Sequence, residues 1–191
     1  MSDAGRLARE LLSDDETRAE AAAAALAQLG EPAFDAVSSL LQSPEDETRW
    51  WAVRAAAAIP GPRSDSALLT ALDDAAPAVR QAAALGLRLR PAVGATAALA
   101  RHLDDPDALT ARLASDALAA LGPSALPELR LAAASPDAAV RINAVRAMAL
   151  LKDQAAIPEL FIALDDASTV VRHWAERGLE DLGVGMVFFA P

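Results

Sequence analysis

The side chains of this chain that could support metal or nucleophilic chemistry are few. His102 is followed by Asp104 and His173 by Glu176, but there is no His-Glu dipeptide and no HExxH helix of the kind that holds zinc. Cysteine is absent, which excludes disulfides and thiolate metal sites and leaves the redox compartment open. A phosphate-cradling glycine loop and a Ser/His/Asp set with a plausible nucleophile are also missing. The sequence therefore predicts no catalytic residue, no cofactor and no metal site.

A second set of polar side chains is periodic. Six arginines are spaced by 31, 31, 32, 29 and 31 residues: Arg18, Arg49, Arg80, Arg112, Arg141 and Arg172. A fixed period in this range is typical of stacked repeat proteins. Regular placement once per repeat favours a structural ion-pair role for these arginines, and anion recognition is the alternative. Arg112 lies nine residues before Leu121, whereas Arg141 lies ten before Leu151, so the arginine of the fourth repeat is one step out of register.

The elements that position these arginines are pairs of helices, called A and B in each repeat. In the fifth B helix Val140, Ala144, Met148 and Leu151 recur at intervals of three and four residues, which indicates an apolar stripe facing a core. Gly and Pro mark the helix ends. The predicted A helices are 4–12, 32–42, 66–72, 91–103, 125–134 and 155–164, and the predicted B helices are 16–29, 44–59, 77–89, 107–121, 137–151 and 168–182.

Composition narrows the class of protein. The net charge is −10 and the pI about 4.6, which disfavours nucleic acid as a partner because phosphate binding needs a basic surface. No segment reaches the roughly 20 apolar residues that span a membrane. The start, MSDAGRLARELL, lacks the apolar core of a signal peptide. We expect a cytoplasmic protein that binds neither nucleic acid nor membrane, with a single repeat domain over residues 1–183.

The end of the chain, residues 184–191, is an apolar tail. The run Met186-Val187-Phe188-Phe189 is too short to span a membrane. We expect this tail to cover the open end of the last repeat; the alternative is that it pairs two molecules into a homo-oligomer.

The recurring pattern D-D/P-x-x-x-V-R-x-x-A…A-L resembles HEAT repeats, specifically the bacterial PBS-lyase HEAT-like type, over about residues 5–183. The resemblance implies an all-α, right-handed α-solenoid of about six helix pairs. It also implies a ladder in which aspartates and arginines at the A–B turns join neighbouring repeats. The matching positions are Asp73, Asp74 and Arg80; Asp137 and Arg141; Asp165, Asp166 and Arg172; and Arg49, with Glu45 and Asp46 in place of the aspartates.

Family members mostly act as protein-binding scaffolds, and a few are enzymes or enzyme subunits. Deoxyhypusine hydroxylase resembles this fold but holds its irons with repeated His-Glu pairs, which this chain lacks. HEAT-like DNA glycosylases use tryptophan and an acidic residue in a strongly basic groove. Trp50, Trp51 and Trp174 fit that pattern, but the net charge does not. Bilin lyase subunits share the repeat, which is a likeness of fold only.

The remaining arginines point to a binding surface. Arg54, Arg146 and Arg177 each lie five residues after a recurring arginine, about 140° further round the helix. We expect them on the concave face formed by the B helices, where Trp and Arg commonly anchor partners. The residues predicted to bind a partner are Trp50, Val53, Arg54, Leu85, Arg88, Arg112, Ile142, Val145, Arg146, His173 and Arg177.

The sequence thus predicts a non-catalytic scaffold that binds a segment of another, unidentified protein on its B-helix face. The alternative is an enzyme or enzyme subunit of a HEAT-like family, either bilin lyase-like, metal-dependent or DNA-directed. It is disfavoured by the missing His-Glu pairs and the net charge of −10. A second location for binding is the acidic edge formed by the A–B turns.

Overall fold

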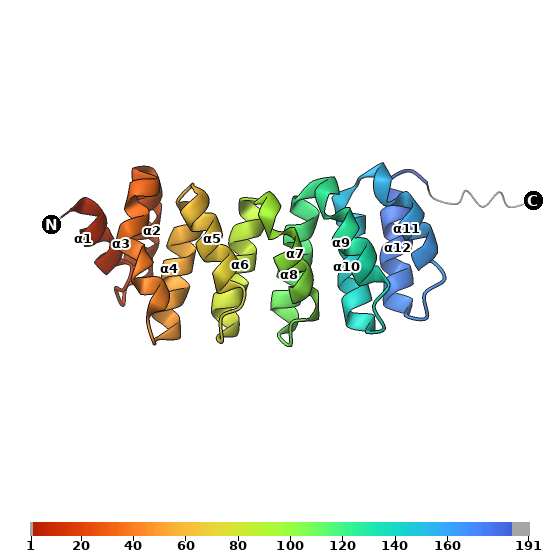
Figure 1. Cartoon of the computed structure of the whole chain (residues 1–191), viewed down its shortest axis with the longest axis horizontal. Coiled ribbons are helices and arrows are strands. Elements are labelled where there is room, and N and C mark those ends of the chain that lie inside the picture. Colours follow the sequence, from red (N-terminus) through yellow and green to blue (C-terminus); the bar gives the residue numbers. More distant parts are fainter. Residues whose placement is uncertain (1, 185–191) are drawn as a thin grey trace, which may run out of the picture. The chain divides into compact units, whose positions relative to one another are not determined.

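The structure, a computed structural model, describes residues 2–184, and within these residues it contains helices and no strand. The chain divides into two compact units, Met1–Ala92 and Val93–Pro191. Figure 1 shows both units as rows of paired helices, coloured red to yellow-green in the first and green to blue in the second. The all-α fold is confirmed. The single domain over 1–183 stays a prediction, and the tail beyond Val184 lies outside the described residues.

In the N-terminal unit each A helix packs against the B helix that follows it, and successive B helices contact each other. The A helices are α1 (Asp3–Glu10), α3 (Phe34–Ser38) and α5 (Pro62–Ala71), and the B helices are α2 (Glu16–Leu29), α4 (Asp46–Ala58) and α6 (Pro77–Leu89).

The C-terminal unit repeats this arrangement. Its A helices are α7 (Thr96–Arg101), α9 (Leu126–Ala133) and α11 (Ile157–Ala163), and its B helices are α8 (Ala108–Ala120), α10 (Ala138–Leu151) and α12 (Thr169–Asp181).

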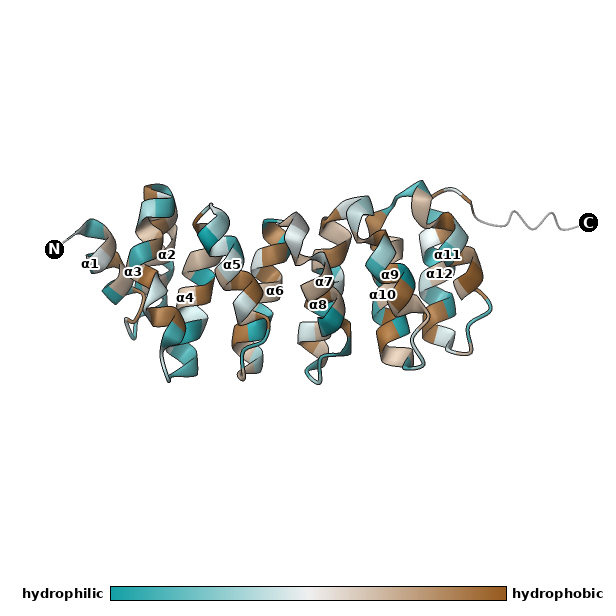
Figure 2. Ribbon diagram, viewed as in Figure 1, coloured by the Kyte–Doolittle hydropathy of each residue, from teal (hydrophilic) through white to brown (hydrophobic). Residues whose placement is uncertain are grey.

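The B helices lie within two residues of their predicted bounds at each end, so these predictions are confirmed. Local signals explain their starts. Asp15 caps α2 by accepting from the backbone N–H groups of Thr17 and Arg18, and Asp107 caps α8 by accepting from Thr110. Figure 2 shows hydrophilic residues at the turn that leads into α4.

Two predicted A helices are wrong in detail because they are interrupted. The segment 32–42 is a 3-10 turn (Glu31–Ala33), the short α3, and a second 3-10 turn (Leu40–Gln42). The Ser38 hydroxyl donates to the carbonyl of Asp35 at 2.9 Å, and such side-chain bonds compete with helix formation. Likewise α7 is flanked by 3-10 turns at Val93–Ala95 and His102–Asp104. The helix α5 begins four residues earlier than predicted, because Pro62 occupies its first turn after Gly61, whose φ is 133°.

Small residues bring successive B helices close together. The tenth residue of each B helix is alanine or glycine: Ala25, Ala55, Gly86, Ala117, Ala147 and Gly178. A Cβ added to Gly86 would lie 2.7 Å from the Cβ of Ala57 in α4, and one added to Gly178 would lie 2.9 Å from that of Ala149 in α10. The interior therefore depends on alanine–glycine contacts as well as on large buried side chains such as Leu26, Leu118 and Met148.

Candidate functional site

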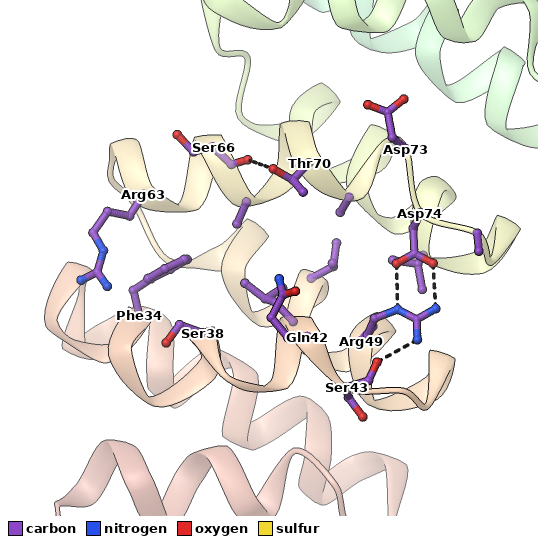
Figure 3. Close-up of a pocket in the computed structure, with 16 residues that line it drawn as sticks. Phe34, Ser38, Gln42, Ser43, Arg49, Arg63, Ser66, Thr70, Asp73 and Asp74 are labelled. Atoms are coloured by element: carbon purple, nitrogen blue, oxygen red, sulfur yellow. Dashed lines mark hydrogen bonds and ion pairs between the residues drawn. The ribbon is translucent and has the colours of Figure 1, made fainter.

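The arginine at the fourth position of a B helix reaches the turn of the next repeat. In α4, Nε and Nη2 of Arg49 donate to the two carboxylate oxygens of Asp74, each at 2.8 Å (Figure 3). Its Nη1 donates to the carbonyls of Ser43 and Pro44 in its own turn, at 3.0 and 3.1 Å. One guanidinium therefore joins two successive turns through a bidentate ion pair, a geometry that lysine cannot reproduce.

The C-terminal unit contains the same device. Arg141 in α10 donates to both carboxylate oxygens of Asp166, at 2.8 and 3.1 Å, and its Nη1 donates to the carbonyls of Ser135 and Pro136. Asp74 and Asp166 each lie two residues before the N-cap of the next B helix, and each also accepts the N-cap residue's backbone N–H. These carboxylates are thus held from two sides.

The acids nearest to the arginines in sequence are not their bidentate partners. Asp137, placed in the ladder with Arg141, caps α10 by accepting from the backbone N–H of Ala139 at 2.7 Å. Arg80 and Arg172 donate to the carbonyls, not the carboxylates, of Asp74 and Asp166. The ladder is therefore corrected to pairs 25 residues apart, Arg49–Asp74 and Arg141–Asp166.

In the fourth repeat the arginine lies one position later in its B helix than Arg49 and Arg141 do in theirs. The fourth residue of α8 is Ala111, and Arg112, one step further, is exposed. The turn of the next repeat then carries Ser135 instead of aspartate, and this serine accepts the N–H of Asp137. The first repeat is alike, with Ala19 as the fourth residue of α2 and Ser43 in the following turn. Aspartate at the turn thus accompanies arginine in the preceding B helix.

These ion pairs lower the pKa of the two aspartates. The guanidinium of Arg141 holds the pKa of Asp166 below its ordinary value, and Arg49 does the same for Asp74. A carboxylate whose folded-state pKa is depressed stabilises the fold above its unfolded pKa of about 4, and this stability is lost as pH falls through the folded-state value.

We therefore expect Asp166→Asn to lose less stability than the parent between about pH 5 and pH 3, because it has no ionised carboxylate left to protonate. Urea unfolding midpoints measured across this range provide the test. The control is Asp165→Asn, since Asp165 is exposed and makes no ion pair within residues 2–184. Parallel pH profiles for Asp166→Asn and the parent would contradict the assignment.

Two of the predicted partner-binding arginines are already engaged. Arg54 pairs with Glu20 of α2, and its guanidinium carbon lies 4.7 Å from the ring centroid of Trp50 and 5.3 Å from that of Trp51. Arg146 pairs with Asp116 of α8 at 2.7 Å and lies 5.4 Å from the ring centroid of Trp174. At these two positions acids of the preceding B helix therefore offset the positive charge of the arginines.

Two predicted contacts are core residues. Val53 and Val145, the eighth residues of α4 and α10, are each 1% exposed. A B helix contacts an A helix and the flanking B helices, so its buried arc is wider than one stripe and includes these valines. Both are corrected from partner contacts to packing residues.

The other predicted residues lie at or near the surface. In the C-terminal unit Arg112, Ile142 and Arg146 come together with Trp174 along an open groove of about 720 Å³, here called the α8–α10 groove. Trp50 is half-buried and lines a second groove between α2 and α4. Leu85 and Arg88 of α6 are exposed, as are His173 and Arg177 of α12.

A groove that the sequence did not indicate lies between α3 and α5. It has a volume of about 640 Å³, and Phe34 and Arg63 stand at one end of it and Asp74 at the other (Figure 3). Its lining also includes the polar side chains of Ser38, Gln42, Ser66 and Thr70. Arg63 lies 4.7 Å from the ring centroid of Phe34, a contact that no local sequence signal would reveal because the two residues belong to different A-helix segments.

Within residues 2–184 no group of three or more His, Asp or Glu side chains could hold a metal ion. His102 is buried, with Nδ1 3.2 Å from a carboxylate oxygen of Asp105, and His173 is exposed beside Trp174. Within the same residues no helix is both long and apolar enough to cross a membrane.

The family follows from the repeat itself. The sequence profile described as HEAT repeats matches residues 6–88 and 96–180. This chain belongs to the HEAT-repeat family. No curated protein sequence matches it.

Solved structures share the fold of this HEAT-repeat protein. The CpcE–CpcF complex of phycocyanin lyase from Nostoc sp. PCC7120 is similar at 23% identity and a TM-score of 0.56, over 96% of this chain and 78% of the other. YibA of E. coli has 18% identity and a TM-score of 0.62, over 94% and 70%. A designed armadillo repeat protein in complex with the peptide (KR)4 has 20% identity and a TM-score of 0.50, over 95% and 100%.

Proposed function

We propose that this HEAT-repeat protein is a non-catalytic binding module that holds a segment of a partner protein on the surface of its B helices. The observation that carries the proposal is the α8–α10 groove. There Arg112, Ile142 and Arg146, which lie up to 34 residues apart in the sequence, line one surface with Trp174. Aromatic, arginine and aliphatic side chains of this kind are the usual anchors of protein interfaces.

The repeat architecture supports this role. Neighbouring B helices present parallel rows of side chains, so a linear segment can contact several repeats at once. The designed armadillo repeat protein that resembles this chain holds a peptide, (KR)4. Within residues 2–184 no group of three or more His, Asp or Glu side chains could hold a metal ion, so a metal-dependent reaction has no such site to support it there.

The test is capture of a partner from an extract of the organism that encodes the protein. Arg112→Glu combined with Ile142→Asp should weaken capture at least about tenfold, which corresponds to about 1.4 kcal/mol. Both side chains line the groove, and Arg112 makes no ion pair within residues 2–184.

The matched control is Leu131→Asp combined with Ile162→Asp, which changes two exposed side chains, 71% and 74% exposed, on the A helices α9 and α11. It should leave capture unchanged. A partner that is retained by the groove variant and lost from the A-helix variant would place the binding surface on the A helices instead. Circular dichroism must show equal helicity in both variants.

A further inference from the structure

The N-terminal unit has a groove between the first turns of α2 and α4, here called the α2–α4 groove. Its volume is about 580 Å³, and the side chains that give it chemical character are the carboxylates of Asp14, Glu16, Glu45 and Glu47 and the indoles of Trp50 and Trp51. No arginine or lysine lines it. It differs in this from the α8–α10 groove, where two arginines are present.

The four carboxylates make no ion pair within residues 2–184, and all four are exposed. The nearby arginines are committed elsewhere: Arg18 to Glu10, Arg49 to Asp74 and Arg54 to Glu20. The dipoles of α2 and α4 offset only part of the negative charge of these four carboxylates. Each helix N-terminus is equivalent to about half a positive charge, so two helices offset about one of the four negative charges.

The half-buried indole of Trp50 adds a surface that suits a cation, whereas the indole of Trp51 is buried. Trp50 and Trp51 meet edge to face, with ring centroids 4.8 Å apart and an interplanar angle of 76°. The molecule itself pairs these indoles with an arginine outside the groove lining, because Arg54 lies against both rings while pairing with Glu20. The same combination of guanidinium, ring and carboxylate recurs where Arg63 lies over Phe34 and pairs with Asp35 at 2.6 Å.

We propose that the α2–α4 groove binds an arginine side chain of a basic segment in a partner protein. This inference rests on the proposed binding function and deepens it, since it states the chemistry of the partner. Arginine fits better than lysine because its planar guanidinium can stack on an indole and pair with a carboxylate in the same pose. An acidic segment is disfavoured, because it would add like charge beside four unpaired carboxylates.

The test uses the full chain with Trp174→Phe, so that the emission of Trp50 and Trp51 reports on this groove alone. The probe is a tetra-arginine peptide with blocked termini, titrated at low salt, and the comparison peptide is tetra-citrulline, which keeps the shape and removes the charge. We expect tetra-arginine to change the emission and tetra-citrulline not to. The affinity should fall as salt rises past about 0.1 M, where charges are screened beyond about 10 Å.

Two double variants decide whether binding is local. Glu45→Gln with Glu47→Gln should weaken tetra-arginine about three- to tenfold, as loss of two favourable exposed charges predicts. The control Glu176→Gln with Glu180→Gln removes the same charge from exposed positions of α12 and should change the affinity less than about twofold. Equal weakening by both variants would show attraction to the net negative chain and overturn the proposal, as would no binding of tetra-arginine.

This outcome is separate from the capture experiment. If tetra-arginine fails to bind while the Arg112 and Ile142 variant loses its partner, the proposed function stands and the cation site fails. The opposite result is that tetra-arginine binds through Glu45 and Glu47 while the captured partner still binds both the Arg112 and Ile142 variant and the Glu45 and Glu47 variant. In that case the cation site stands, and the partner does not bind on the B-helix surface.

Discussion

Replacing Arg49 with alanine should lower the free energy of unfolding by about 1–3 kcal/mol without changing the fold. The side chains of Arg49 and Asp74 are only 16% and 13% exposed, so water replaces the lost partner poorly. The substitution removes two hydrogen bonds to the carboxylate and the bonds to the carbonyls of Ser43 and Pro44. Asp74 would keep its backbone bond from Ala76 but lose its cation.

Urea unfolding followed by circular dichroism measures this effect, and Arg112→Ala is the matched control. Arg112 lies one position out of register and is exposed, so its removal should change stability by less than about 0.5 kcal/mol. Arg49→Lys should fall between the two, because an ammonium keeps the charge and loses the bidentate geometry. Equal stability of Arg49→Ala and Arg112→Ala would show that the inter-repeat pair contributes nothing measurable.

The arginine period identified the B helices because it reports a repeated local environment, the fourth position after a capped turn. Pairing could not be assigned in the same way. Each turn contains an acid close to its arginine, such as Asp137 before Arg141, but a residue that caps its own helix has its oxygen directed at backbone N–H groups. The true partner, Asp166, is 25 residues away. The presence of serine at 43 and 135, after alanine at 19 and 111, is the sequence signal that could have revealed the pairing.

The surface chemistry was harder to predict than the fold. Helix periodicity places Arg54 and Arg146 away from the stripe, but their partners, Glu20 and Asp116, belong to the preceding B helix. The sequence position of those acids gives no indication of the contact, because adjacent helices can align in several registers. The same reason applies to the grooves, whose shape depends on how closely neighbouring repeats approach.

Helix periodicity also gives a wrong prediction for Val53 and Val145, which it places on the binding face although they are buried in the core. A helix with neighbours on several sides buries more than one stripe, so positions on the flank of the stripe become core. In an alanine-rich helix the sequence hardly marks the limit of that buried arc, because alanine is compatible with both buried and exposed positions. The large side chains alone, Trp51 buried and Trp50 half-buried, show where the boundary falls in α4.

Replacing Gly178 with alanine should destabilise the C-terminal unit, although alanine is the better helix former by about 1 kcal/mol. An added Cβ would lie 2.9 Å from the Ala149 Cβ, 2.9 Å from a methyl of Leu160 and 3.0 Å from the Ala149 Cα. The last of these is a backbone atom, so relief requires α12 to move away from α10. Overpacking of this kind typically costs about 1–3 kcal/mol, so we expect a net loss of up to about 2 kcal/mol.

Thermal unfolding measures the effect, and a loss of 1 kcal/mol corresponds to about 2–4 °C in the melting temperature of a chain this size. Gly94→Ala is the control, because a Cβ there meets no atom within 4 Å, and it should leave the melting temperature unchanged or slightly raised. In a double-mutant cycle, Ala149→Gly should recover part of the Gly178→Ala loss, since it removes one of the three close contacts. A stabilised Gly178→Ala protein would mean that successive B helices can separate at no cost, and that the alanine and glycine at their tenth positions reflect helix propensity rather than close packing.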